Sequence, residues 1–207
     1  MASTSSPYGV QIVSDLSGTP RTARLPFGIA SGYGSSIFKY QPIKLSTATG
    51  TIQAVSNPGG TPDKLWGIFA GVEYTPLGAR PAVSPFWPAG TVFDPTYEMF
   101  VYYWPIWMPG TRLRVQADGA VSQAQIGQSF NFTNLGNGST QTGLSSCTVG
   151  AAGVLANGQG QLTLTEFDTG VYDAGQPVGA PGGDAYTDLI CTVAYPQIGF
   201  APQPSIG

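Results

Sequence analysis

The stretch TRLRVQADG, residues 111–119, alternates between apolar and polar side chains along most of its length. A period of two places the two sets on opposite faces of a β-strand. The turn pair Asp118-Gly119 then predicts a hairpin that leads into residues 120–127. The two alternating sets are Leu113, Val115 and Ala117 on one face, and Arg112, Arg114 and Gln116 on the other.

Similar strand signals continue from Phe27 to the C-terminus, separated by turns rich in Gly, Pro and Asn. The segment YEMFVYYWPIWMPG, residues 97–110, is apolar on both pleat faces, which indicates a strand at the centre of a sandwich or one buried at an interface. No stretch has a convincing helical period. The sequence therefore predicts an all-β fold, an antiparallel β-sandwich or barrel with an extended N-terminal arm. Further strands are expected within residues 35–46, 50–60, 65–76, 128–134, 141–150, 160–168 and 185–200.

Residues 1–26 form the predicted N-terminal arm. The segment YGVQIV alternates, with Tyr8, Val10 and Ile12 on one side, and no helical period follows it. A segment like this cannot bury itself alone. It either adds as a strand to a neighbouring subunit or stays a loose terminus.

The β-rich domain is expected to span residues 27–207. Its composition shifts near residue 126, because aromatic residues dominate before this point and Gly, Ser, Thr and Asn after it. This shift is compatible with two subdomains, 27–125 and 126–207. Interleaved strands of one domain would have the same composition.

The chain is poor in charge. Charged residues make up 9% of its 207 residues, against about 25% in an average soluble domain. The net charge is −3 and the eight Lys and Arg are scattered, which disfavours nucleic acid as a partner because a phosphate backbone calls for a basic stripe. The absence of His excludes Ser-His-Asp and Cys-His catalysis and the usual zinc sites. We expect no metal and no cofactor, and we expect much of the surface to face another protein.

The cysteines and the apolar runs indicate the compartment. Cys147 and Cys191 are too few for a disulfide framework, and we interpret them as two buried free thiols, with a pairing between them left open. No basic region followed by an apolar run marks a signal peptide at the N-terminus. The apolar run of residues 99–108 is too short for a bilayer, which takes about 20 residues. We therefore expect a soluble protein made in the cytoplasm, with no membrane partner.

One tripeptide matches a catalytic motif. Asp168-Thr169-Gly170 has the three residues that carry the catalytic carboxylate of aspartic proteases. Such an enzyme needs two carboxylates that share one proton, and a single DTG leaves only a homodimeric protease open. Val171 follows where the retroviral type has Ala or Ser, and Asp and Gly suit the turn that ends the preceding strand. We interpret the tripeptide as a turn and predict no catalytic residue.

Several stretches follow one another in a recognisable order: LWGIFAGVEYTP, SPFWPAGT, RLRVQADG, AQIGQSFNF, GLSS and DAYTDLICTVAYPQIGF. Their order and spacing resemble the β-rich head decoration (cement) proteins of tailed bacteriophages, over roughly residues 65–200. The resemblance implies a structural protein, neither an enzyme nor a cofactor carrier. It would bind the outside of an assembled icosahedral shell and hold capsid subunits together.

The same resemblance implies the partners. They are the major capsid protein and, in a homotrimer, further copies of this chain, on the surface of the virion after synthesis in the host cytoplasm. The alternative is a receptor-binding or carbohydrate-binding appendage of the virion, because aromatic side chains also form platforms for sugars.

Aromatic residues and the arm are the expected contacts with the capsid or with other subunits. Trp87 stands between two prolines and is the preferred candidate, whereas Trp66 and Trp104 suit a core position equally well. The predicted contact residues are Tyr8, Val10, Ile12, Trp66, Phe86, Trp87, Trp104 and Trp107.

Overall fold

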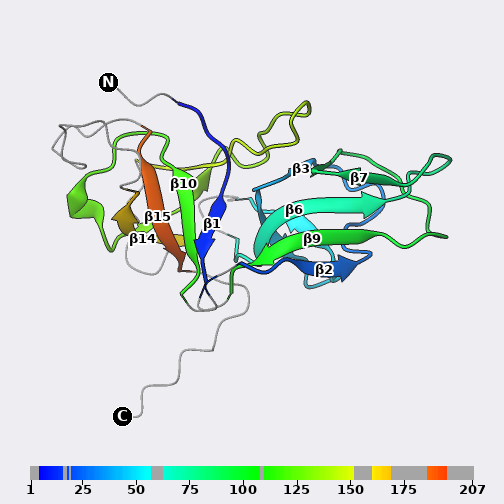
Figure 1. The fold of residues 1–207 in the computed structure, drawn as a ribbon, viewed down its shortest axis with the longest axis horizontal. Helices are drawn as coiled ribbons and strands as arrows, with labels where there is room; N and C mark the ends of the chain where they lie inside the picture. Colours follow the sequence, from blue (N-terminus) through cyan, green and yellow to red (C-terminus); the bar gives the residue numbers. More distant parts are fainter. Residues whose placement is uncertain are drawn as a thin grey trace, which may run out of the picture.

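Strands dominate the fold (Figure 1). The computed structural model describes residues 5–15, 18, 20–56, 63–107, 110–151, 160–168 and 186–194. Within these ranges the regular structure consists of β-strands and a 3-10 turn at Gln123–Gln125, without an α-helix. The named strands pair antiparallel. The predicted all-β, antiparallel fold is confirmed.

A five-stranded sheet, here called sheet A, has the order β1-β10-β15-β14-β11 (Figure 1). Strand β10 alternates as expected, because Leu113 and Val115 are fully buried while Arg112 and Arg114 lie half-buried on the other face. The predicted hairpin after β10 is wrong, since β10 pairs with β1 and β15 and residues 123–125 form the 3-10 turn. The bounds are β1 Gln11–Ser14, β10 Arg112–Gln116, β15 Asp188–Val193, β14 Leu162–Phe167 and β11 Ser129–Phe130.

A six-stranded sheet, here called sheet B, has the order β2-β9-β6-β4-β5, and β7 pairs with the end of β6. The segment that is apolar on both faces forms β9, a central strand between β2 and β6. Val101 and Tyr103 of β9 are buried, and the alternate residues lie on the outer face. The bounds are β2 Ala23–Pro26, β9 Phe100–Pro105, β6 Gly67–Tyr74, β4 Pro42–Leu45, β5 Ile52–Ala54 and β7 Ala82–Ser84.

A two-stranded sheet contributes to the core beneath each large sheet. Strands β12 (Phe132–Thr133) and β13 (Thr148–Val149) supply Phe132 and Val149 to the larger core, which sheet A covers. Strands β3 (Ile37–Phe38) and β8 (Phe86–Trp87) supply Ile37 and Trp87 to the smaller core under sheet B. Both cores are built from large apolar side chains with little or no exposure.

The two sheets do not divide the chain near residue 126. The chain passes from sheet B to sheet A between the end of β9 at Pro105 and the start of β10 at Arg112. A later loop then returns to the first half, where Lys39 donates its N–H to the Gly143 carbonyl and Ser145 donates to the Lys39 carbonyl, both at 2.9 Å. Residues on both sides of position 126 also share the larger core, because residues 27–125 supply eight of its buried side chains: Val55, Leu65, Ile68, Ile106, Leu113, Val115, Ala117 and Val121.

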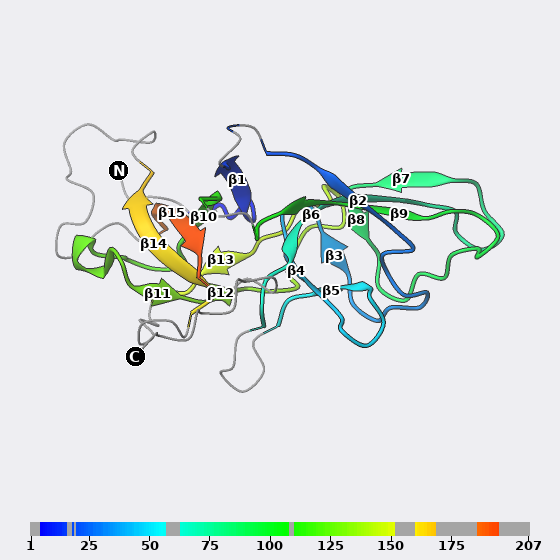
Figure 2. The same ribbon diagram turned by 90° about the horizontal axis from the view of Figure 1, so that it is seen from below.

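The N-terminal arm fills the edges of this chain's own sheets (Figure 2). Strand β1 pairs with β10, with Ile12 opposite Leu113, and β2 pairs with β9. The structure thus corrects both expectations for the arm, a strand added to a neighbour and a loose terminus. The physical reason is Val10, whose side chain is fully buried in the larger core and holds the arm against sheet A.

Candidate interaction surfaces

Two of the predicted contact residues lie inside the chain. Trp87 is fully buried, and its ring lies 5.1 Å from that of Tyr74 and 6.5 Å from that of Phe93, centroid to centroid. Its flanking prolines suggested a surface loop, but β8 pairs with β3 and the pleat turns the indole into the smaller core. Val10 is fully buried in the larger core. Neither side chain reaches the surface of this chain, which corrects their assignment as contacts.

The other predicted contact residues lie at least partly at the surface. Phe86 stacks on Phe38 with ring centroids 5.6 Å apart, and Trp66 packs against Tyr103 at 6.3 Å. Trp107 is 36% exposed. Their contact with a capsid remains a prediction. Five members of this group are half-buried: Tyr8, Ile12, Trp66, Phe86 and Trp104.

The β6–β7 and β8–β9 loops, with β7 and the end of β2, lie at the end of sheet B that is farthest from sheet A (Figure 1), and they carry a cluster of exposed apolar residues. Two loops meet here, since Leu77 donates its N–H to the Val92 carbonyl at 3.1 Å and Pro76 bridges to Phe93. Val83 stands opposite Glu73 on the edge strand β7. We call this cluster the apolar tip; its members are Val83 (80% exposed), Leu77 (64%), Tyr97 (54%), Val92 (48%) and Phe27 (46%).

A second surface follows the outer face of β9. Phe100, Tyr102 and Trp104 alternate with the buried residues of this strand and are half-buried. The Arg24 guanidinium lies 4.1 Å from the centre of the Phe100 ring, and the Tyr102 hydroxyl donates to Glu73 at 3.0 Å. The stripe ends at Trp104, whose ring stacks on Tyr40 with centroids 5.5 Å apart and planes 4° from parallel.

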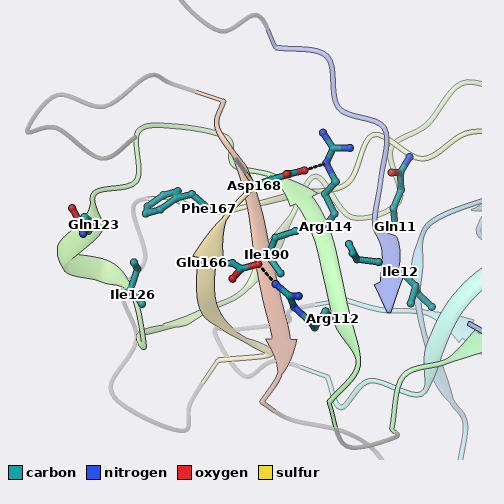
Figure 3. Close-up of a pocket in the computed structure, with 11 residues that line it drawn as sticks. Gln11, Ile12, Arg112, Arg114, Gln123, Ile126, Glu166, Phe167, Asp168 and Ile190 are labelled. Carbon is teal, nitrogen blue, oxygen red and sulfur yellow. Dashed lines mark ion pairs between the residues drawn. The ribbon is translucent and has the colours of Figure 1, made fainter. Parts of the chain in front are cut away.

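Two adjoining hollows lie beside this stripe and share Gln11 and Ile12 of β1 in their linings. The smaller hollow, about 390 Å³, is lined by Pro20, Tyr40 and Trp104 as well. The larger one, about 550 Å³, extends over the outer face of sheet A (Figure 3). We call the pair the β1 groove.

The floor of the larger hollow is ionic (Figure 3). Arg114 Nε lies 2.6 Å from Asp168 Oδ2, and Arg114 Nη2 lies 2.7 Å from Asp188 Oδ2. Arg112 pairs with Glu166 across the same face. The strand alternation of β10 therefore places both arginines where the ends of β14 and β15 present their carboxylates.

The position of Asp168 bears on the protease alternative. Its carboxylate is held by Arg114 from β10, and its backbone N–H donates to the Asp188 carbonyl at 3.0 Å. An aspartic protease dyad needs two carboxylates that share a proton, whereas the group that Asp168 faces here is the Arg114 guanidinium, at 2.6 Å. The arrangement is that of a structural ion pair. Thr169 and Gly170 of the motif lie outside the described residues.

Tyr8 joins the arm to this ionic face. The Arg114 guanidinium lies 5.4 Å from the centre of the Tyr8 ring. Burial, and next the negative charge of Asp188, raise the pKa of Tyr8 well above its usual value. Tyr8 therefore loses its proton less readily in the folded chain than in the unfolded chain, and this difference stabilises the fold. The stabilisation is fully present below the pKa of tyrosine in the unfolded chain, near 10. This stabilisation is lost as the pH rises above about 10.

The Tyr8→Phe variant tests this linkage. We expect the unfolding free energy of the unaltered chain to fall more steeply than that of the variant between about pH 9 and about pH 11, measured by urea unfolding, because Phe has no proton to lose. Tyr97→Phe, at an exposed position, is the control and should leave the slope unchanged. Equal slopes for Tyr8→Phe and the unaltered chain would show that Tyr8 is not docked as described.

The two cysteine thiols are buried and unreactive. Cys147 and Cys191 are both free and fully buried in the larger core, as the sequence suggested. Burial raises the pKa of Cys191 to about 12 and raises that of Cys147 further. Since the thiolate is the reactive form, neither cysteine is placed for nucleophilic or redox chemistry.

Within the described ranges, neither a metal site nor a membrane-spanning helix is formed. No group of three or more Cys, Asp or Glu side chains there is arranged to hold a metal ion. No helix in this part of the chain has the length and apolarity needed to cross a membrane.

Sequence analysis missed the apolar tip and Tyr40. The signal for the tip was present, because Leu77, Val83 and Val92 sit among Pro and Gly residues in segments that punctuate strands and are therefore exposed. Tyr40 carried no such signal. Its backbone adopts a φ of 68°, which is rare for a residue other than Gly, Asn or Asp, and this turn brings its ring to Trp104.

Comparison of the chain with known protein families, with curated proteins and with solved structures found no match.

Proposed function

We propose that this chain is a structural virion protein that binds the outer surface of an icosahedral capsid through its apolar tip. The observation that carries the proposal is the tip itself, where five large apolar side chains of β7 and the neighbouring loops and strand ends are exposed on a chain with only 9% charged residues. Clusters of this kind on a soluble protein commonly mark a site of protein–protein contact.

The composition of the tip resembles that of a protein interface. The tip combines exposed aromatic and aliphatic side chains, and the exposed charges of Arg80 and Glu98 lie in the same segments of the chain. Protein interfaces combine an apolar centre with a polar rim in this way. Val83 adds a further element, because it lies on a short edge strand whose backbone can pair with a strand of a partner.

The major capsid protein is the partner that the motif order of residues 65–200 favours, through its resemblance to head decoration proteins. A repeated lattice lets many weak contacts act together, and a homotrimer would present three tips at once. The structural role is also supported by the pairing of Asp168 with Arg114, which uses the carboxylate of the DTG motif to join β14 to β10.

A variant of the tip tests the proposal. Leu77→Ser together with Val83→Ser should weaken binding to capsids that lack this protein by at least tenfold, measured by co-sedimentation. Burial of one such side chain contributes about 1.5–3 kcal/mol, and about 1.4 kcal/mol corresponds to a factor of ten.

The chain offers a matched control. Leu144→Ser together with Val13→Ser makes the same chemical changes at exposed positions outside the tip, where the side chains are 36% and 45% exposed. We expect the control to bind capsids as the unaltered chain does. Unchanged binding of the tip variant, or an equal loss in both variants, would contradict the tip as the docking surface.

A further inference from the structure

The β1 groove crosses the outer side of the molecule where sheet A meets sheet B. Its two hollows adjoin, because Gln11 and Ile12 line both of them. The hollows of about 390 Å³ and 550 Å³ each fall within the range of about 300–1,000 Å³ that is usual for small-molecule sites. The groove does not include any residue of the apolar tip.

The smaller hollow offers a pair of parallel aromatic rings. Tyr40 and Trp104 are both half-buried, and the stacked pair lines the smaller hollow. Tyr40 keeps its left-handed backbone because two hydrogen bonds hold it: its N–H donates to the Phe69 carbonyl and its carbonyl accepts from Val10, both at 2.8 Å. Backbone strain that the surroundings hold in place often occurs at binding sites. The Lys39 ammonium lies 5.2 Å from the centre of the Tyr40 ring.

The larger hollow offers planar polar side chains that are already held in place. The ion pairs of Arg112 with Glu166, and of Arg114 with Asp168 and Asp188, fix these groups before any ligand arrives. Gln11 stands at the junction and can both donate and accept hydrogen bonds. The lining holds two arginines and two carboxylates, Glu166 and Asp168, so its formal charge is zero and this floor has no excess of positive charge.

We propose that the β1 groove binds a neutral oligosaccharide. A pyranose ring presents C–H groups on its flat face, which pack on aromatic rings, and hydroxyl groups around its edge, which pair with planar amide, carboxylate and guanidinium groups. Tyr40 and Trp104 supply the first surface, and Gln11 with the ion pairs of sheet A supplies the second. A single nucleic-acid strand also stacks on aromatic rings but calls for a positively charged groove, which the floor of the larger hollow does not provide.

This binding goes beyond the proposed capsid contact and does not depend on it. The capsid contact uses the tip, at the far end of sheet B, whereas the groove lies beside β1. One chain can therefore be docked on a capsid while its groove faces a glycan. Loss of one activity would leave the other measurable.

The test uses the purified full chain on an array of neutral and anionic glycans, and then calorimetric titration of the neutral glycan with the highest signal. Trp104→Ala should weaken its binding at least tenfold, while Trp107→Ala, the same change at an exposed Trp outside the groove, should change it less than twofold. Gln11→Ala serves as a second variant that removes only a half-buried polar side chain, and we expect a loss of at least threefold. The tip variant, Leu77→Ser together with Val83→Ser, changes residues outside the groove and should bind the glycan as the unaltered chain does.

Three results would overturn the assignment. One is the absence of any neutral glycan bound by the unaltered chain, including the case in which only anionic glycans bind. Another is tight binding of an oligothymidylate strand or an extended peptide in the groove without glycan binding. The third is glycan binding that Gln11→Ala and a folded Trp104→Ala leave unchanged, or that Trp107→Ala weakens as strongly as they do.

Discussion

Replacing Trp87 by Ala is expected to lower the free energy of unfolding by about 3–5 kcal/mol, the usual range for removing a fully buried large aromatic side chain. The indole is one of the largest fully buried side chains of the chain and contacts the rings of Tyr74 and Phe93. Its removal leaves a cavity under sheet B, because β8 is fixed by its pairing with β3 and cannot collapse into the space. Urea unfolding followed by circular dichroism measures the change.

Trp107→Ala is the control for this loss. Trp107 lies at the surface and belongs to neither core, so its replacement should cost about 1 kcal/mol or less. Should the two variants lose the same stability, Trp87 would not be the core residue that the structure describes. A normal stability of Trp87→Ala with impaired capsid binding would restore Trp87 as a contact residue.

Val10→Asp is expected to release the N-terminal arm from sheet A. An unpaired carboxylate in an apolar core costs several kcal/mol, so the arm leaves the core rather than bury the charge. The edge of β10 then loses its partner strand. Cleavage within residues 5–15 by an unspecific protease should become at least tenfold faster, because cleavage follows the population of the open form. Mass spectrometry of the fragments locates the cuts.

Val13→Asp makes the same change three residues away, where the side chain is 45% exposed. The irregularity in the β1–β10 register between Ile12 and Ser14 leaves Val13 without a direct partner. The control arm should therefore stay docked and resist the protease as the unaltered chain does. Equal cleavage of the two variants would mean that Val10 does not anchor the arm, and would reopen its role toward a neighbouring subunit.

The sequence predicted where the strands lie along the chain better than it predicted which strands pair with one another. Alternation located β10, and the apolar segment of residues 97–110 correctly indicated a central strand, since β9 lies between β2 and β6. The hairpin predicted after β10 does not form. Turn residues such as Asp118-Gly119 permit a reversal, but the edges of β10 are taken by β1 and β15, which are distant in the sequence.

The candidate contacts were harder to predict because burial depends on those long-range pairings. Trp87 and Val10 are apolar residues of the kind found at interfaces, yet β8 and the arm place both side chains in this chain's own cores. Gln11 and Trp104 line the same hollow only because β1 lies beside the end of β9. The left-handed turn at Tyr40 has no signature in the sequence. The ion pair of Arg114 with Asp168 likewise joins residues of two strands that β15 separates.

A structural virion protein, as proposed for this chain, is a stoichiometric part of the viral shell. The most direct measurement is its copy number in purified virions, by quantitative mass spectrometry against the major capsid protein. The proposal predicts a fixed ratio that follows the capsid lattice, such as one trimer at each local threefold position. A few copies per particle, or none in particles from cells that make the protein, would contradict it.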